Sequence, residues 1–209
     1  IHFAGYKAVD ESIEKPISYY NNNIVSTLNL LECMKKNKVY NLIFSSSATV
    51  YNESKSLTLK ESGKIGNTKN PYGSSKFIIE KILMDLAKFD NKWSIRIARY
   101  FNPISNHSSG IIKENPKNIP NNLLPLIIKV AKKQLSFLKV FGRNYRTKDG
   151  TCVRDYIHVM DLADGHISIL NKIKKKGFKV YNFGTGKGSS VLEVIKAFEK
   201  QTGKFIKYK

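Results

Sequence analysis

Apolar residues recur along this chain with two alternating periods, one typical of helices and the other of buried strands. The first helical set is Ile17, Tyr20, Ile24, Leu28 and Leu31. With Pro16 in the first turn, it predicts a helix from Pro16 to about Lys36. A short apolar run over 41–45 predicts a buried strand. Further helices are predicted from Pro71 and over 123–133, 158–174 and 191–201, further strands over 93–101, 138–141 and 180–183, and loops over 52–70 and 102–122. This alternation predicts βαβ units and a parallel sheet, hence an α/β protein.

The formal charge of +20 is the first feature of composition that bears on function. A basic protein can bind nucleic acid, because clustered Lys and Arg hold phosphates. Here only five of the 36 basic residues are arginine: Arg96, Arg99, Arg143, Arg146 and Arg154. Arginine is the residue that makes bidentate contacts with phosphates and bases. Since the lysines are scattered through every predicted helix, we expect solvated faces and no nucleic-acid partner.

Cysteine and hydropathy patterns indicate the compartment. Cys33 and Cys152 match no metal-ligand or redox spacing, which favours a reducing cytoplasmic setting. No apolar stretch approaches the roughly 20 residues of a membrane span, and no signal peptide opens the chain. The histidines follow no metal-ligand pattern either. We therefore expect a cytoplasmic protein that binds neither a membrane nor a metal.

Tyr72 and Lys76 are the first candidates for chemistry. They are four residues apart just after Pro71, so the start of one predicted helix presents a phenol and an ammonium group on the same face. A phenol with a pKa near ~10 is a poor base, and a nearby cation would lower that pKa. Ser47 follows the predicted strand at 41–45, and ligands bind at the carboxyl ends of parallel strands. The three residues predict proton transfer at a substrate hydroxyl, although the Tyr72/Lys76 spacing also occurs in ordinary amphipathic helices.

Six runs of sequence, in order and at matching spacing, resemble the UDP-glucose 4-epimerases of the extended short-chain dehydrogenase/reductase type. They are Phe3–Val9, Phe44–Tyr51, Pro71–Gly73, Arg99–Pro103, Pro120–Leu123 and Gly150–Val159. The resemblance implies an α/β fold with a doubly wound parallel, Rossmann-like sheet, present in part, and a smaller C-terminal substrate-binding lobe. Residues 1–102 would belong to the NAD-binding domain and 103–209 mostly to the nucleotide-sugar-binding lobe, with about 154–185 returning to the main sheet.

The resemblance also implies a fragment, because the glycine-rich loop of the family would precede Ile1 and residues that close the substrate pocket would follow Lys209. The 209 residues by themselves are therefore expected to be inactive. For the full-length protein the resemblance implies a homodimer. It further implies NAD-dependent epimerisation at C4 of a UDP-hexose through a 4-keto intermediate, as in the interconversion of UDP-glucose and UDP-galactose in galactose metabolism.

Individual roles follow from the same resemblance. Tyr72 would remove and return the proton of the 4-hydroxyl, Ser47 would hydrogen-bond that oxygen, and Lys76 would bind the nicotinamide ribose and lower the pKa of Tyr72. The implied NAD contacts are Phe3, Ala4, Gly5, Lys7, Asn22, Tyr72, Lys76, Tyr100 and Phe101. The implied UDP-sugar contacts are Ser47, Asn102, Asn122, Leu123, Phe141 and Arg154. Arg154 suits the diphosphate because its guanidinium can bind two oxygens at once.

Several alternatives remain open from the sequence. Dehydratases that also oxidise C4 need an acid and a base beside the catalytic hydroxyl, and Ala48 and Thr49 after Ser47 supply no carboxylate, which disfavours dehydration. A decarboxylase or a 4-epimerase of another sugar, including N-acetylated sugars, stays possible. A non-catalytic basic binding module is the competitor from a different class. Phe141 could also be an ordinary core residue and Asn122 a helix cap.

Overall fold

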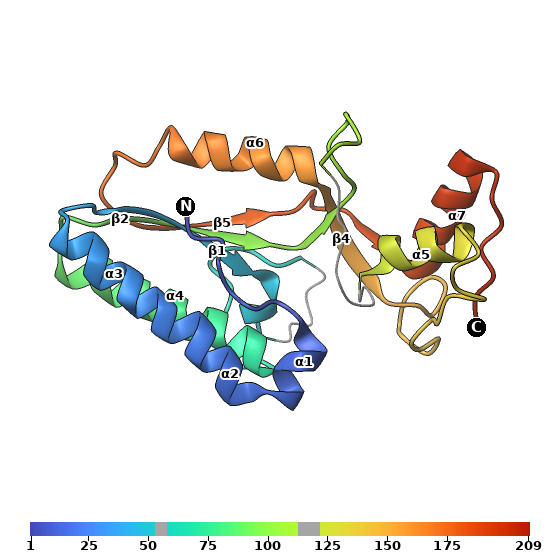
Figure 1. Cartoon of the computed structure of the whole chain (residues 1–209), viewed down its shortest axis with the longest axis horizontal. Coiled ribbons are helices and arrows are strands. Elements are labelled where there is room, and N and C mark those ends of the chain that lie inside the picture. The colour runs from blue at the N-terminus through green and yellow to red at the C-terminus, as the bar shows by residue number, and fades with distance from the viewer. Residues whose placement is uncertain (53–57, 113–121) are drawn as a thin grey trace. The chain divides into compact units, whose positions relative to one another are not determined.

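The computed structural model describes residues 1–52, 58–112 and 122–209 (Figure 1). The chain divides into two compact units. The first unit comprises Ile1–Tyr100 and Ala163–Phe183, and the second comprises Phe101–Leu162 and Gly184–Lys209. Among the described residues, no helix is both long and apolar enough to cross a membrane.

A parallel sheet forms the centre of the first unit. Its strands are β1 (Asn41–Ser47), β2 (Ser94–Tyr100) and β5 (Gly177–Phe183), in the order β1-β2-β5. Helices α3 and α4 lie on one face of this sheet and α6 on the other (Figure 1), so β1 and β2 read as continuous buried runs rather than alternating ones. The predicted α/β class with a parallel, Rossmann-like sheet is confirmed.

Four of the five α-helices described in the first unit lie within segments that were predicted to be helical. The five are α1 (Val9–Glu14), α2 (Pro16–Tyr20), α3 (Ser26–Lys36), α4 (Pro71–Phe89) and α6 (Val159–Leu170), whose first four residues belong to the second unit. The helix predicted from 16 to 36 is divided by a π-helical turn, Asn21–Val25, in which Asn23 is buried. Such turns occur frequently at functional sites. Helix α1 was not predicted.

The core of the first unit lies between the sheet and helices α3 and α4. Its buried members are Leu31, Leu42, Phe44, Ile79, Leu83, Trp93, Ile95 and Ile97. Helix α4 starts sharply because Asn70 accepts a hydrogen bond from the Gly73 amide at 2.8 Å and Pro71 occupies its first turn. This fixed start determines which face of α4 the residues after Pro71 present to the sheet.

The second unit contains a small mixed sheet and two helices. Strands β3 (Asn102–Ile104), β4 (Val153–His158) and β6 (Gly188–Ser190) pair in that order, with β3 parallel and β6 antiparallel to β4. Helices α5 (Leu123–Ala131) and α7 (Val191–Thr202) enclose a second core. The buried members of that core are Ile127, Val130, Leu138, Ile195 and Ile206.

Over residues 102–174 the structure corrects three predictions and adds one strand. The predicted loop from Asn102 opens with β3, and β4 was not predicted because its mixture of polar and apolar residues matches no buried strand. The segment 138–141 forms only an isolated bridge, between Leu138 and Tyr208. Helix α6 ends at Leu170 rather than at 174, and in the turns after it the Arg96 guanidinium donates to the carbonyl oxygens of Lys172 and Lys175.

Candidate functional site

Ser47, Tyr72 and Lys76 meet in the first unit at the carboxyl end of β1. Ser47 is the last residue of β1, and the other two lie in the first turns of α4. The Ser47 side chain lies close enough to the Tyr72 phenol to lower the pKa of that group. The buried Lys76 Nζ donates to the Ser45 carbonyl at 2.7 Å and lies 6.0 Å from the centre of the Tyr72 ring. The fold therefore brings together the three residues predicted to move a proton.

The protonation state of this group depends mainly on burial. Burial raises the pKa of Tyr72, an effect that the neighbouring Ser47 side chain opposes. Burial also lowers the pKa of Lys76 to about 8, while the charge of Glu80 acts in the other direction. In the chain by itself burial outweighs the effect of Ser47, and a lowering of the Tyr72 pKa by Lys76 stays a prediction for the complex with NAD. Loss of the phenol proton thus requires further positive charge in the reacting complex.

A segment over residues 3–7 passes close to Lys76 and is held by Asn23 of the π-helical turn. The Asn23 side chain donates to the Tyr6 carbonyl at 3.1 Å and to Ser75 Oγ at 3.0 Å, and accepts from the Tyr6 amide at 2.7 Å. Gly5 has φ 154°, and a Cβ there would lie 3.2 Å from Asn23 Oδ1 and 3.8 Å from Lys76 Nζ. A side chain at this φ would be strained and would crowd Asn23, so glycine suits the position. Asn23 was not predicted as a functional residue. The usable signal was the run of three asparagines, Asn21 to Asn23, inside a predicted helix.

Aromatic rings gather at the carboxyl ends of β2 and β5. Tyr100 pairs in register with Ser47 and its hydroxyl lies 2.7 Å from His166 Nε2. The His166 ring lies 5.2 Å from that of Phe3 and 5.0 Å from that of Phe183. Burial raises the pKa of Tyr100 to about 12, so this phenol is a hydrogen-bonding group rather than a base. His166 was also missed, since one histidine in an apolar helix gives no signal.

The other predicted cofactor residues are distributed as follows. Ala4 and Lys7 are exposed in the segment that Asn23 holds, and Asn22 donates to Asn23 Oδ1 at 3.0 Å. Phe101 is the first residue of the second unit. The Lys76 ammonium has three N–H donors, and the bond to the Ser45 carbonyl uses one of them. The remaining donors can bind hydroxyl groups such as those of a ribose-containing cofactor.

The second unit contains a cavity of about 370 Å³, within the usual size range of ligand pockets. The five predicted UDP-sugar contacts of this unit all line it: Asn102, Asn122, Leu123, Phe141 and Arg154. Phe141 is 77% exposed, which excludes the alternative of ordinary core packing. Asn122 occupies the N-cap position of α5 without a capping hydrogen bond from its side chain to the described backbone of that helix. The cap alternative is therefore not supported.

Charge and polarity make this cavity suitable for an anion. Arg154 is exposed and its Nη1 donates to the Val153 carbonyl at 2.9 Å. Lys139 is the second cation of the lining. Among the described residues that line the cavity, none is acidic. A guanidinium and an ammonium group in one cavity favour the oxygens of a phosphate or diphosphate. Leu123 and Phe141 give the cavity an apolar side.

Comparisons with known proteins agree with this geometry. Residues 1–184 match the model of the NAD dependent epimerase/dehydratase family. The whole chain is 54% identical to UDP-glucose 4-epimerase from Haemophilus influenzae and 53% identical to that from Homo sapiens, and covers 62% and 60% of these proteins. The chain thus spans about three-fifths of the length of the curated relatives it matches.

Two solved structures that are similar to this chain are also of UDP-glucose 4-epimerases. UDP-glucose 4-epimerase from Bifidobacterium longum in complex with NAD+ and UDP is 55% identical, with a TM-score of 0.95. The enzyme from Stenotrophomonas maltophila with bound NAD and formylated UDP-arabinopyranose is 42% identical, with a TM-score of 0.96. Each comparison covers 100% of this chain and 62% of the solved one.

Proposed function

Because this chain belongs to the NAD dependent epimerase/dehydratase family, we propose that the full-length protein carrying it is a UDP-hexose 4-epimerase. It interconverts UDP-glucose and UDP-galactose, a step of galactose metabolism, through a 4-keto intermediate. The observation that carries the proposal is that Ser47, Tyr72 and the buried Lys76 meet at the carboxyl end of β1, with the Lys76 ammonium 6.0 Å from the Tyr72 ring centre. The names of the relatives, UDP-glucose 4-epimerases, support it.

In the proposed mechanism Tyr72 takes the proton of the sugar 4-hydroxyl and later returns it. Ser47 donates a hydrogen bond to the same oxygen and keeps it next to the phenol. Lys76 binds the ribose hydroxyls of the cofactor through the donors that Ser45 does not use, and its charge stabilises the phenolate. The chemistry supplied by NAD, when bound, is the acceptance and return of the C4 hydride. Ala48 and Thr49 after Ser47 supply no carboxylate, so water elimination from the intermediate is disfavoured.

We assign NAD binding mainly to the first unit and nucleotide-sugar binding to the second. The proposed cofactor contacts are Phe3, Ala4, Gly5, Lys7, Asn22, Tyr72, Lys76, Tyr100 and Phe101. The proposed UDP-sugar contacts are Ser47, Asn102, Asn122, Leu123, Phe141 and Arg154. The cavity lining supports the second assignment, because its cations fit a diphosphate and its apolar side fits a base ring.

We further propose a cytoplasmic homodimer. The two free thiols, Cys33 and Cys152, suit a reducing compartment. A largely apolar groove between α3 and α4, which includes Leu28 and the 79% exposed Phe89, supports a second subunit as its partner.

The proposed activity is tested by expressing the full-length protein and measuring the conversion of UDP-galactose to UDP-glucose. NAD released after denaturation should be stoichiometric with the protein. The same assay with UDP-N-acetylgalactosamine reports whether N-acetylated sugars fit. Protein that carries NAD and converts neither sugar would contradict the proposal.

Arg154 offers a test of the diphosphate site that does not depend on turnover. Replacing it by Leu in the full-length protein should weaken UDP binding by about 1.5–3 kcal/mol, the usual value of a charge-assisted hydrogen bond. Isothermal calorimetry with UDP measures the loss. Arg146→Leu is the control, because Arg146 is exposed in the same unit but is not among the residues around the cavity. Equal UDP affinity in both variants would assign Arg154 a structural role.

A further inference from the structure

A polar row, buried at Ser46 and Arg99 and half-buried at Asn182, crosses the parallel sheet immediately before the residues of the proposed active site. Ser46 on β1 pairs in register with Arg99 on β2, and Arg99 pairs with Asn182 on β5. The next row toward the carboxyl ends begins with Ser47 and Tyr100. The mechanism proposed above gives the polar row no role, yet every residue of it touches another segment of the first unit.

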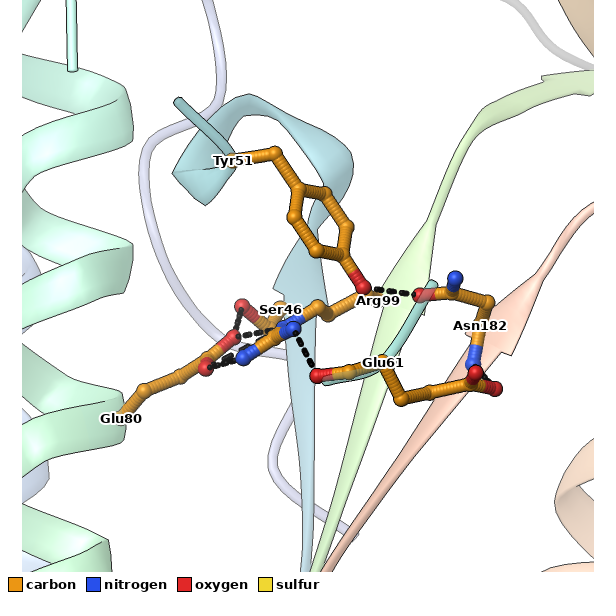
Figure 2. Close-up of polar contacts among 6 residues, drawn as sticks. All are labelled: Ser46, Tyr51, Glu61, Glu80, Arg99 and Asn182. Carbon is orange, nitrogen blue, oxygen red and sulfur yellow. Dashed lines mark hydrogen bonds and ion pairs between the residues drawn. The ribbon is translucent and has the colours of Figure 1, made fainter. Parts of the chain in front are cut away.

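Glu80 of α4 joins this row to the helix that carries Tyr72 and Lys76. Its carboxylate accepts hydrogen bonds from Ser46 Oγ and from two nitrogens of Arg99, Nε at 3.0 Å and Nη2 at 2.6 Å. The side chains of Arg99 and Glu80 are only 3% and 2% exposed. Figure 2 shows the carboxylate and the guanidinium facing each other with the serine hydroxyl beside them.

A second set of contacts connects Arg99 to the segment that follows β1. Arg99 Nη1 donates to the Glu61 carbonyl at 3.3 Å, and the Tyr51 ring centre lies 4.7 Å from the guanidinium carbon. The Tyr51 hydroxyl donates to Asn182 Oδ1 at 2.6 Å, and the backbone N–H of Asn182 donates to Glu61 Oε1 at 2.9 Å. The guanidinium thus lies between the α4 carboxylate and the segment around Glu61 (Figure 2).

We infer that the Glu80–Arg99 ion pair, with Ser46, positions the proposed active site by fixing the rotation of α4 on the sheet. Glu80 lies four residues after Lys76 and eight after Tyr72, so all three occupy one face of the helix. Ser46 directly precedes Ser47 on β1. A carboxylate bound to Ser46 and Arg99 therefore determines where the Tyr72 phenol meets Ser47. The inference rests on the function proposed above, since it assigns positioning residues to that site.

Stability alone does not account for this pair. Apolar residues of similar volume often replace a buried ion pair without loss of stability, whereas a two-nitrogen contact between arginine and a carboxylate fixes orientation. Glu80 also acts on Lys76 directly, because its negative charge opposes the effect of burial on the pKa of that ammonium. Through both effects Glu80 acts on Tyr72 and Lys76 without itself touching a substrate.

The test compares positioning with stability in the full-length protein. The double variant Glu80→Leu with Arg99→Met removes both charges, so neither is left buried alone. We expect a melting temperature within a few degrees of the wild type, a KM for UDP-galactose within about threefold, and a kcat lowered about tenfold or more, because small misplacements of reacting groups are costly. A role in stability alone would leave kcat unchanged in a folded variant.

Two single variants complete the design. Lys81→Gln removes an exposed ion pair from the same helix and should leave kcat, KM and melting temperature unchanged. Ser46→Ala removes one bond to Glu80 with little change in volume, and should lower kcat without raising KM. A folded double variant with wild-type kcat overturns the inference. Should the double variant not fold, wild-type kcat in Ser46→Ala overturns it. A wild-type protein that does not epimerise refutes the proposed function instead, so the two failures are distinct.

Discussion

Replacing Tyr72 with Phe in the full-length protein should lower turnover by about 10²–10⁴-fold, the usual contribution of general acid–base catalysis. The affinity for UDP-sugar should stay nearly unchanged, because the variant keeps the ring and loses only the hydroxyl group near Ser47. Initial rates with UDP-galactose and calorimetry with UDP measure the two quantities separately. Binding without turnover is the pattern that distinguishes a base from a binding residue.

Tyr40→Phe is the matched control for this change. Tyr40 precedes β1, at the end of the strand opposite to Ser47, and its ring packs edge-on against Trp93 at 5.4 Å. The control loses a phenol hydroxyl in the same unit and should keep wild-type turnover. If Tyr72→Phe retained more than about a tenth of the wild-type rate, another group would have to remove the proton.

Much of the fold could be predicted from periodicity because its main elements are buried in simple ways. Strand β1 is covered on both faces, so Leu42, Ile43 and Phe44 appear in the sequence as one apolar run. Helix α4 has an apolar stripe, with a proline and an asparagine at its start. The π-helical turn within 16–36 could not be predicted in this way, since it depends on Asn23 reaching Tyr6 and Ser75 from another part of the chain.

The residues of the candidate site also fall into two groups, those that the sequence predicted and those that it did not. Ser47, Tyr72 and Lys76 were predicted because a strand end and a helix start are local features with a definite spacing. Glu80 and Arg99 were not, because a charged residue on a helix usually indicates a solvated face. The usable signal was Arg99 inside a predicted strand of the parallel sheet: a charge buried in a sheet that is covered on both faces needs a partner. The raised pKa of Tyr72 depends on burial, which no sequence spacing reports.

Lys76 provides the second large effect, since its proposed contribution to the chemistry acts through Tyr72. Lys76→Met keeps the length of the side chain but removes the charge and the hydrogen bond to the Ser45 carbonyl. We expect turnover to fall about as far as in Tyr72→Phe, roughly 10²-fold or more. NAD retention should fall as well, because the proposed ribose contact is lost, so rates are compared at saturating NAD.

The double variant Tyr72→Phe with Lys76→Met shows whether the two residues act as one unit. The Lys76 ammonium lies 6.0 Å from the Tyr72 ring centre, close enough to stabilise a phenolate, and its proposed effect on the proton transfer acts through that phenolate. Once the phenol is absent, removing the charge should therefore cost little more, and the double variant should be no slower than the slower single variant within about threefold. Residues that cooperate in catalysis show this non-additivity. Fully additive losses in activation free energy would instead mean that Lys76 contributes through the cofactor alone, and that the phenolate is stabilised by another charge.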